Sequence, residues 1–581
     1  MLLTQSSLFC PPIKFSFGKC PKTRIPLFAN HHERNNNIGF ISGKSCVLYN
    51  GYSYFTSPCH PLELELPKHG LMVDESIDDD DDDSTGIGIV KFFEGKNIFI
   101  TGATGLLGKD LVEKILRSTP VGKIYLLIKA KDKEAAFDRL TKEIINSDLF
   151  QCLKEEHGKS YEGFVREKLI PIVGNICEPN LGMDSDSANA VRKDVDVIIQ
   201  SAASTTLNDR YDMLLDANVN APQRLMRFAK TCKNLKLFAH ISTAYVNGRR
   251  EGIMLEEPLI MGENRRKYDD DDISSSFPRL DVADEINMAL KSSTASTDYD
   301  VTKNLKRLGQ ERAANFGWYN TYHLTKAMGE MVLNEIRGDV PLVIIRPTVI
   351  ESSYKEPFPG WIQGNRMFDP VIISYGKGQL PAFFGNSDVT MDIIPVDMVA
   401  NTTIAAIAKD GTTHRPQSNV YHVASSDINP LRYLDFFEYL YEYFNSTPLI
   451  ESQKSIARIK YFDNFKDFSQ YTREEIISRT NGFGDTNTIT KNEETNIRKT
   501  QNQCKAKIAY AEQLCKMYEF IGFFNARFHT GNTQKLMKEM SKKEQLDFEI
   551  NAMNIDWRKY FQDIHIPGLK KHILNGTRTS I

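Results

Sequence analysis

A short apolar run that leads into three spaced glycines, and then into a helical pattern, constrains the fold more than any other part of the chain. Residues 98–100 (Ile-Phe-Ile) favour a strand, Gly102, Gly105 and Gly108 follow, and apolar residues then recur at helical spacing over 107–116. In such a strand–turn–helix unit the first glycine allows a tight turn, the second lets a pyrophosphate approach the backbone, and the third lets helix and strand pack closely. The helix N-terminus then offers free N–H groups to phosphate oxygens.

The spacing of these glycines distinguishes two kinds of phosphate site. A Walker A loop needs a glycine five positions before its Gly-Lys pair and a Ser or Thr after it, but Ala103 and Asp110 stand at those positions. The spacing Gly-x-x-Gly-x-x-Gly resembles instead the short-chain dehydrogenase/reductase superfamily. Contacts with a dinucleotide are therefore expected from Thr101, Gly102, Thr104, Gly105, Leu106, Leu107 and Gly108.

Charges after the second expected strand, over 123–128, indicate which dinucleotide binds. NAD enzymes of this architecture place Asp or Glu at the end of that strand, whereas NADP enzymes place cations there for the 2′-phosphate. This chain has Lys129 and Lys131 there, and Arg139 on a helix expected over 133–147. NADPH is therefore the expected cofactor.

Two further strands complete the expected cofactor surface. The strand over 169–176 should end near the adenine, and small residues after the strand over 195–199 would let the backbone lie against the cofactor. The contacts expected there come from Asn175, Ile176, Ala202 and Ala203. Asn218, on a helix expected over 214–232, is assigned to packing.

Two distant segments carry groups suited to acid–base chemistry. A strand over 237–241 runs into Ser242 and Thr243, and Tyr322 and Lys326 share one face of an expected helix. Because a neighbouring ammonium favours the phenolate, Lys326 should lower the pKa of Tyr322 from roughly 10 and also hold the nicotinamide ribose. Tyr322 would then exchange a proton with a substrate carbonyl oxygen, to which Thr243, or else Ser242, would donate a hydrogen bond.

Longer strings resemble one known family. They are KIYLLIKA (123–130), STAYVNG (242–248), Tyr322 with KAMGE (326–330), EPFPGWIQGNR (356–366), YGKGQL (375–380) and HIPGL (565–569). Over about residues 90–575 the chain resembles the plant fatty acyl reductases of the male-sterility type, especially their plastid members, within the extended short-chain dehydrogenases/reductases. The resemblance assigns cofactor contacts to Gly102, Gly105 and Gly108, and catalysis to Thr243, Tyr322 and Lys326.

This resemblance implies a reaction. A long-chain fatty acyl thioester, carried on acyl carrier protein or coenzyme A, would be reduced with NADPH to a primary fatty alcohol. The first hydride would give a hemithioacetal that releases the thiol and leaves an aldehyde, and the second would give the alcohol. Kinship with the plastid members further implies a product for the sporopollenin lipid of the pollen wall.

The expected fold class is α/β, a Rossmann-type doubly wound parallel sheet with a smaller substrate domain and a C-terminal helical module. The reductase domain should cover 91–425, substrate-domain helices 426–477, a disordered linker 478–502, and the helical module 503–581. Seven aromatic residues of this last part would form its own core rather than line an acyl tunnel: Phe520, Phe523, Phe524, Phe528, Phe548, Trp557 and Phe561. The segment 357–361 is either a wall of the cleft or a surface turn.

The N-terminal composition points to an organelle. Residues 1–60 contain one acidic residue, Glu33, against six Lys or Arg, which is typical of a transit peptide and predicts a chloroplast location. An unprocessed tail is the alternative. Residues 61–90, with six consecutive Asp, should form a disordered acidic linker.

Composition also excludes several classes. A net charge of −3 gives no sign of nucleic-acid binding, and no apolar run approaches the roughly 18 residues of a transmembrane helix. Nine cysteines without a C-x-x-C pair predict neither a disulfide framework nor a metal site. Peripheral contact with a membrane stays open.

Two other functions fit the first motif. One is a different extended short-chain enzyme, such as a nucleotide-sugar epimerase or a ketone reductase, although those chains usually lack the C-terminal module. The other is a non-enzymatic dinucleotide-binding protein, although such proteins have commonly lost the tyrosine or lysine that this chain retains at Tyr322 and Lys326.

Overall fold

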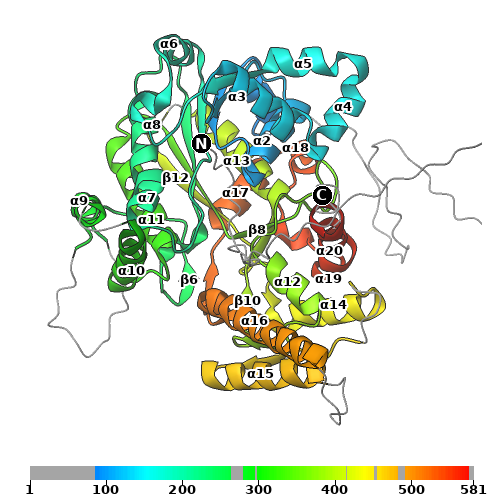
Figure 1. Cartoon of the computed structure of the whole chain (residues 1–581). Coiled ribbons are helices and arrows are strands. Elements are labelled where there is room, and N and C mark those ends of the chain that lie inside the picture. Colours follow the sequence, from blue (N-terminus) through cyan, green and yellow to red (C-terminus); the bar gives the residue numbers. More distant parts are fainter. Residues whose placement is uncertain are drawn as a thin grey trace, which may run out of the picture. The chain divides into compact units, whose positions relative to one another are not determined.

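Figure 1 shows the protein as a computed structural model, which describes residues 86–263, 279–294, 298–413, 415–449, 455–481 and 491–574. The expected transit peptide over 1–60 and the run of Asp residues lie outside the described residues. The short helix α1 (Ile89–Phe93) already belongs to the fold, so the last residues of the predicted linker are structured.

A seven-stranded parallel sheet forms the centre of the reductase part. Its strand order is β12-β7-β5-β4-β1-β2-β3, and all six pairings are parallel. In that order the strands are β12 (Ser418–Val423), β7 (Leu342–Pro347), β5 (Leu237–Ile241), β4 (Val197–Gln200), β1 (Ile98–Thr101), β2 (Ile124–Ile128) and β3 (Leu169–Val173). The expected doubly wound α/β sheet is confirmed.

Side chains of β1 alternate between the two faces of this sheet. Ile98 and Ile100 pack with Leu111 in one apolar cluster, whereas Phe99 packs with Leu225 in another. This alternation follows from the two-residue period of a strand, and the helices that connect parallel strands must cover both faces. On the first face lie α2 (Leu106–Ser118) and α13 (Val396–Thr412), and on the second α8 (Ala221–Ala229) and α11 (Thr321–Ile336).

The helix expected over 214–232 is interrupted. The chain forms α7 (Tyr211–Leu215), then the π-helical turn η6 (Asp216–Asn220), and then α8. Pro222 has no N–H to bond the carbonyl of Asn218, and a Cβ on Gly329 of α11 would overlap that carbonyl oxygen. The irregular turn therefore lies directly against α11.

The remaining helices of the reductase part flank the sheet or lie between Gly248 and Tyr322. The helix expected over 133–147 is α3 (Lys133–Leu140) followed by the π-helical turn η2 (Thr141–Ile145). The other helices here are α4 (Gln151–His157), α5 (Tyr161–Lys168), α6 (Ser185–Asp194), α9 (Val282–Ser293) and α10 (Asp298–Phe316). The described residues between Gly248 and Tyr322 are thus partly helical.

The rest of the described chain lies outside the seven-stranded sheet. Its helices are α12 (Asp369–Gly376), α14 (Tyr433–Ser446), α15 (Phe465–Asn481), α16 (Lys491–Gly522), α17 (Gly531–Glu539), α18 (Lys542–Asp547), α19 (Trp557–Lys559), η9 (Tyr560–His565) and α20 (Ile566–Leu569). Its short parallel pairs are β8 (Val349–Glu351) with β11 (Ile393–Pro395), β9 (Ala382–Phe384) with β14 (Lys460–Phe462), and β6 (Gly252–Met254) with β15 (Ala526–Phe528). One short pair is antiparallel, β10 (Thr390–Met391) with β13 (Leu431–Arg432).

A disordered linker was expected over 478–502, but helix α15 extends to Asn481 and α16 begins at Lys491. Only 482–490 of that segment lie outside the described residues. Within the described part of the chain, none of the helices combines the length and apolar character needed to cross a bilayer.

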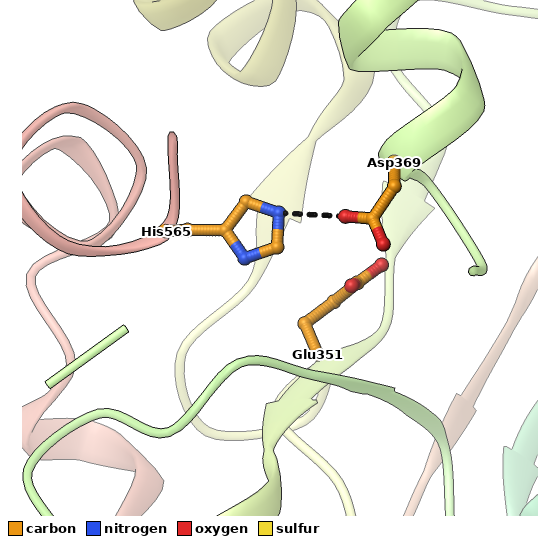
Figure 2. Close-up of side chains that lie close together, drawn as sticks. All are labelled: Glu351, Asp369 and His565. Atoms are coloured by element: carbon orange, nitrogen blue, oxygen red, sulfur yellow. Dashed lines mark ion pairs between the residues drawn. The ribbon is translucent and has the colours of Figure 1, made fainter. Parts of the chain in front are cut away.

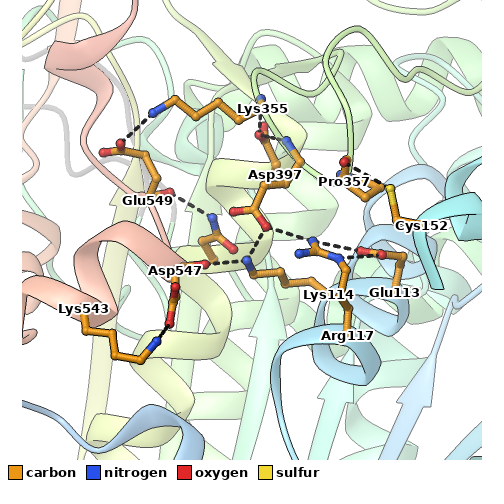
Figure 3. Close-up of polar contacts among 12 residues, drawn as sticks. Glu113, Lys114, Arg117, Cys152, Lys355, Pro357, Asp397, Lys543, Asp547 and Glu549 are labelled. Carbon is orange, nitrogen blue, oxygen red and sulfur yellow. Dashed lines mark hydrogen bonds and ion pairs between the residues drawn. The ribbon is translucent and has the colours of Figure 1, made fainter. Parts of the chain in front are cut away.

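Asp397 lies in the first turn of helix α13 but does not cap it. The N-cap is Pro395. The Asp397 carboxylate instead accepts backbone hydrogen bonds from Tyr354, Lys355 and Glu356 at 2.8–3.0 Å. Hydrogen bonds from three N–H groups stabilise the carboxylate more than one cap contact would. They fix the start of the EPFPGW segment, and Figure 3 shows Asp397 beside Lys355.

Charged contacts join this segment to the cofactor helix and the C-terminal part. Glu356 accepts from Lys114 and from Arg117 of α2, the latter at 2.8 Å. Lys114 also donates to the backbone oxygen of Asp547 at 2.5 Å, and Lys355 pairs with Glu549 at 3.1 Å (Figure 3). Helix α2 is therefore bonded both to the EPFPGW segment and to the C-terminal part.

Two glycines allow the closest contact between these segments. A Cβ on Gly568 would overlap the backbone of Gly360, and a Cβ on Gly360 would lie 2.6 Å from the carbonyl oxygen of Ile564. Trp361 is buried, and its N–H donates to Ser353 Oγ at 2.9 Å. The EPFPGW segment is therefore an internal packing surface for α20, and not a free surface turn.

Gly568→Ala should lower the free energy of unfolding by about 1–3 kcal/mol, because the added methyl group overlaps backbone that cannot move away as a flexible side chain could. Urea unfolding followed by circular dichroism measures the change. The matched control is Gly163→Ala on α5, where a Cβ meets nothing within 4 Å and stability should stay equal or rise slightly. Equal stability of the two variants would contradict the close contact.

Candidate active site

The glycine turn lies against the loop that follows β4. Gly102 has a φ of +78°, and a Cβ there would lie 2.6 Å from the backbone N of Ala202. A Cβ on Gly108 would overlap the Gly102 carbonyl oxygen. The buried Thr101 hydroxyl accepts a hydrogen bond from the Ala202 N–H at 3.3 Å, so this side chain joins two strand ends.

Gly105 and the start of α2 fit a bound pyrophosphate. Gly105 is the N-cap residue, no side chain caps the helix, and its first turn holds no acidic residue. A Cβ on Gly105 would have one neighbour within 4 Å, the Gly102 oxygen at 3.3 Å, so the space in front of the helix is open. Leu106 and Leu107 are buried in the apolar core, which leaves their backbone for a phosphate contact.

A glutamine that the sequence did not single out reaches this turn. Gln363 Nε2 donates to the carbonyl oxygen of Thr104 at 3.2 Å. Gln363 lies within the string EPFPGWIQGNR, whose length was the only available sign of its importance. The segment that packs on α20 therefore also borders the cofactor turn.

The cations expected at the adenosine end differ in their surroundings. Lys129 is exposed, and Lys131 is 84% exposed beside Asp132 at 3.6 Å. Arg139 donates to the Lys129 carbonyl oxygen at 2.7 Å and pairs with Glu143 at 2.7 Å. Lys129 and Lys131 therefore extend into solvent, whereas Arg139 is hydrogen-bonded to the backbone that follows β2.

Asn175 and Ile176 follow β3 at the edge of the sheet. Asn175 Nδ2 donates to Glu178 at 2.8 Å, and its Oδ1 accepts from the Cys177 N–H at 3.2 Å. The side chain of Asn175 thus shapes its own turn, while Ile176 is partly buried.

Three neighbouring strands end together beside the candidate centre. Thr101 pairs in register with Gln200, and Gln200 pairs with His240. The glycine turn, the loop with Ala202 and Ala203, and the Ser242-Thr243 segment therefore leave the same edge of the sheet. Because carboxyl ends of parallel strands share one edge, the predicted cofactor and catalytic segments come together.

The two hydroxyl candidates after β5 have different contacts. Thr243 is buried and accepts from the Tyr245 N–H at 3.5 Å as the cap of a short turn. Ser242 Oγ is also buried, and it has no hydrogen-bond partner among the described residues. Both alternatives from the sequence therefore stay available for a carbonyl oxygen.

Helix α11 carries both remaining catalytic candidates. Its N-cap, Asn320, accepts from the His323 N–H at 2.9 Å and fixes the first turn. Lys326 is buried, and its Nζ donates to the Ile241 carbonyl oxygen at 2.7 Å. Burial lowers the pKa of Lys326 to about 8, although the Glu330 carboxylate opposes this shift.

The expected lowering of the Tyr322 pKa was wrong. Burial raises the pKa of Tyr322 above its usual value, and Lys326 does not offset this because its ammonium lies against Ile241 and His240. A raised pKa keeps the phenol protonated at neutral pH. Tyr322 is therefore poised as a proton donor, which is the form that reduction of a carbonyl requires.

A polar relay under the site was not predicted. Lys326 Nζ lies 3.5 Å from His240 Nε2, and His240 Nδ1 lies 2.5 Å from Gln200 Oε1. Gln200 Nε2 then donates to the carbonyl oxygen of Ala202 at 2.5 Å. Burial and the nearby Lys326 lower the pKa of His240 well below its usual value, so the neutral ring accepts from Lys326 and donates to Gln200.

Asn218 also has more than a packing role. Its Oδ1 accepts from the Ser204 N–H at 3.0 Å, and its Nδ2 donates to the Ser204 oxygen at 3.0 Å and to Thr325 Oγ1 at 3.2 Å. Asn218 therefore fixes the loop after β4 to helix α11. The glycine at position 329, which permits close approach of the two helices, was the signal in the sequence.

A buried ion pair holds the middle of α11. Arg346 of β7 binds Glu330 through Nε at 3.0 Å and through Nη2 at 2.6 Å, and both side chains are fully buried. Arg346 also donates to the Glu257 carbonyl oxygen at 2.9 Å. Removal of either partner would leave an unpaired buried charge, so the pair fixes α11 against the sheet.

Aromatic residues from the C-terminal part line one side of the centre. Tyr245 contacts Phe524 and Phe528 at ring distances of 5.5 and 5.4 Å, and His323 contacts Phe520 at 5.3 Å. His323 also stacks on Tyr245 at a ring distance of 5.3 Å. The aromatic set does not form a core of its own, because its buried members share one core with Ile98 of β1: Phe524, Phe528, Phe548, Trp557 and Phe561.

Two family models match the reductase part and the C-terminal part of the chain separately. A NAD-binding family model described as male sterility protein matches residues 100–403, and a second model with the same description matches 495–576. Fatty acyl-CoA reductase 2, chloroplastic, of Arabidopsis thaliana is 46% identical, over 84% of this chain and 80% of its own. The chain belongs to the male-sterility family of fatty acyl-CoA reductases.

A second relative supports the same family, and a solved structure shares the fold. The alcohol-forming fatty acyl-CoA reductase of Simmondsia chinensis is 35% identical, over 84% of this chain and 99% of its own. The reductase domain of a non-ribosomal peptide synthetase from Mycobacterium tuberculosis has a TM-score of 0.52 at 19% identity, covers 86% of this chain and 96% of its own, and shares the fold. The chain is therefore a family reductase with a nicotinamide dinucleotide site, rather than an epimerase or a non-enzymatic protein.

The reductase should lose activity as pH rises through about 8. Lys326 is charged below its pKa, and only the ammonium form has a third N–H besides those directed at Ile241 and His240. Above pH 8, kcat/KM should fall about tenfold per pH unit, while Tyr322 keeps its proton. Initial rates between pH 6 and 9.5 measure this fall in kcat/KM. Circular dichroism at each pH is the control for folding. A flat profile to pH 9.5 would contradict this role of Lys326.

Proposed function

We propose that this protein reduces a long-chain fatty acyl thioester to a primary fatty alcohol with NADPH. The single observation that carries the proposal is that a relative named as alcohol-forming aligns over 99% of its own length with a chain that contains Thr243, Tyr322 and Lys326. Lys326, one turn after Tyr322 on α11, donates to the end of β5, directly before the Ser242-Thr243 segment. The C-terminal part that epimerases usually lack is present as well.

The chain's own residues divide the work. NADPH bound along the glycine turn supplies a hydride to the substrate carbonyl carbon. The Thr243 hydroxyl donates a hydrogen bond to the carbonyl oxygen, and Tyr322 gives its proton to that oxygen as negative charge develops. Lys326 holds the nicotinamide ribose, and the relay through His240 fixes the direction of the ammonium.

Release of the thiol follows from return of that proton. When the hemithioacetal hydroxyl gives its proton back to Tyr322, the carbonyl reforms, the C–S bond breaks, and the sulfur leaves with the bonding electrons and takes a proton from solvent. The aldehyde then accepts a second hydride and a second proton from Tyr322. The raised pKa of Tyr322 favours its reprotonation between these steps.

The acyl chain would lie along the aromatic side of the centre. One cavity is lined by aromatic residues that include Tyr245, Phe368, Tyr433 and Phe524. Phe520 contacts the ring of His323, the residue after Tyr322. These rings come from the loop after β5, from the starts of α12 and α14, and from the end of α16 and the residues just after it, so a chain between them would contact both parts of the protein. Each methylene group buried there contributes about 0.8 kcal/mol to binding.

NADPH rather than NADH is proposed from the charge after β2. Lys129 and Lys131 are exposed beside the end of that strand, where a 2′-phosphate would lie. Arg139, bound to the Lys129 carbonyl oxygen, holds the turn that carries them.

A plastid location is proposed from the basic N-terminal composition and from the relative named as chloroplastic. The acyl carrier would then be acyl carrier protein or coenzyme A, and the alcohol would serve the sporopollenin lipid of the pollen wall. These details rest on kinship with that relative.

The product assay tests the reaction. Purified full-length protein is incubated with palmitoyl-acyl carrier protein or palmitoyl-CoA and NADPH, and the lipids are separated by gas chromatography. Hexadecanol should form, with roughly two NADPH oxidised per alcohol. Tyr322→Phe is the matched control, which should bind NADPH normally but form no alcohol. Unreacted thioester with every carrier and chain length would refute the proposal, and aldehyde as the only product would restrict it to the first reduction.

The cofactor preference is tested separately with Lys129→Ala. Loss of a contact to the 2′-phosphate should raise the KM for NADPH about tenfold and leave the KM for NADH unchanged. Lys142→Ala, an exposed lysine on the following π-helical turn, is the control and should change neither value. A parallel rise for both cofactors would place Lys129 outside the phosphate site.

A further inference from the structure

Three buried side chains from distant segments meet beside the C-terminal helices. Glu351 ends β8, Asp369 begins α12, and His565 ends η9. Each is 0% exposed, and one possible ligand atom from each lies within 4.8 Å of the others. Figure 2 shows the two carboxylates and the imidazole pointing toward one another.

The atoms that face inward lack hydrogen-bond partners. Glu351 Oε2, Asp369 Oδ1 and His565 Nε2 are all buried without such a partner among the described residues. The last two lie 3.2 Å apart, at ion-pair distance, yet without the geometry of a hydrogen bond (Figure 2). Unpaired buried polar atoms are rare in proteins, so three at one point require an explanation.

The atoms that face outward are all held. Glu351 Oε1 accepts from the Phe368 N–H at 2.9 Å, and Asp369 Oδ2 accepts from the Arg366 N–H at 2.8 Å. His565 Nδ1 lies 2.9 Å from Ser352 Oγ, which leaves Nε2 directed at the carboxylates. Metal sites share this pattern, in which outer hydrogen bonds orient each ligand and the inner atoms stay free for the ion.

We propose that Glu351, Asp369 and His565 form a binding site for one divalent metal ion, and that the ion is Zn²⁺. Two carboxylates balance its charge, and an imidazole nitrogen favours zinc over magnesium or calcium. Neighbouring ligands of a tetrahedral zinc at roughly 2.0–2.1 Å lie about 3.3 Å apart, close to the separation of Asp369 Oδ1 and His565 Nε2.

The competing explanation is a proton shared by the carboxyl groups. Burial and the Asp369 charge raise the pKa of Glu351 well above its usual value, so a proton would also reduce the charge. A proton between the two carboxyl groups would, however, leave His565 Nε2 without a partner, because Nε2 and Asp369 Oδ1 lie 3.2 Å apart without forming a hydrogen bond. The metal explains why all three inner atoms converge.

Such an ion would connect the two family regions of the chain. Glu351 and Asp369 lie in the region matched by the first model, and His565 lies in the region matched by the second. Phe368, whose N–H binds Glu351, lines the same cavity as Tyr245 and Tyr433. The ion would therefore hold the C-terminal helices in place and fix one wall of that cavity.

The metal content of the full-length chain tests this proposal directly. The protein is purified without chelators on a tag that contains no histidine, and multi-element mass spectrometry should find about one zinc per chain. Glu351→Gln, which keeps an oxygen for the Phe368 N–H, and His565→Gln should each reduce zinc about tenfold. His572→Gln is the matched control, because this histidine lies in the same region but pairs with Asp148 at 3.6 Å. It should retain the zinc.

A second measurement keeps the proposal testable if the variants do not fold. X-ray absorption at the zinc edge of the wild-type protein should show only nitrogen and oxygen ligands, and a chelator should lower the melting temperature until zinc is added back. Less than a tenth of an equivalent of any divalent metal, sulfur ligands, or undiminished metal in folded Glu351→Gln would overturn the proposal. Another divalent metal lost in the same variants would support the site and replace zinc as its ion.

Discussion

Close approach between the glycine turn and the loop after β4 is the constraint on which the rest of the structure depends. Gly102 has a positive φ, and its backbone packs on Ala202 so tightly that a Cβ would not fit. Strand β4 lies between β1 and β5, so this contact aligns the cofactor turn with the Ser242-Thr243 segment. The parallel sheet brings these segments to one edge, and Gly102 lets the backbones of the glycine turn and the loop after β4 pack in direct contact.

The catalytic helix is held in this frame by polar contacts at several levels. Asn218 binds its first turns through Thr325, Lys326 binds the end of β5, and the Arg346–Glu330 pair binds its middle to β7. All three contacts are buried, where a lost partner leaves an unsatisfied polar group. Tyr322 thus receives its position from contacts made by its neighbours on the helix.

The C-terminal part is integrated with the reductase part rather than attached to it. Within one loop, Glu356 pairs with α2, Gly360 packs on Gly568, and Gln363 reaches the cofactor turn. Phe520 of α16 and Phe524, just after it, also contact Tyr245 beside the candidate centre. A change in the C-terminal helices would therefore reach both the cofactor turn and the substrate wall.

The sequence by itself determined the main strands of the sheet, the order of the α/β units and the glycine turn, and it predicted the catalytic roles of Thr243, Tyr322 and Lys326, because periodicity and motif spacing are local properties. Only the tertiary structure decided the role of Asp397, the raised pKa of Tyr322, the relay through His240, and the meeting of Glu351, Asp369 and His565. Each of these depends on burial or on partners far away in the chain. Local spacing carries no information about either, because both arise only when separate elements pack together.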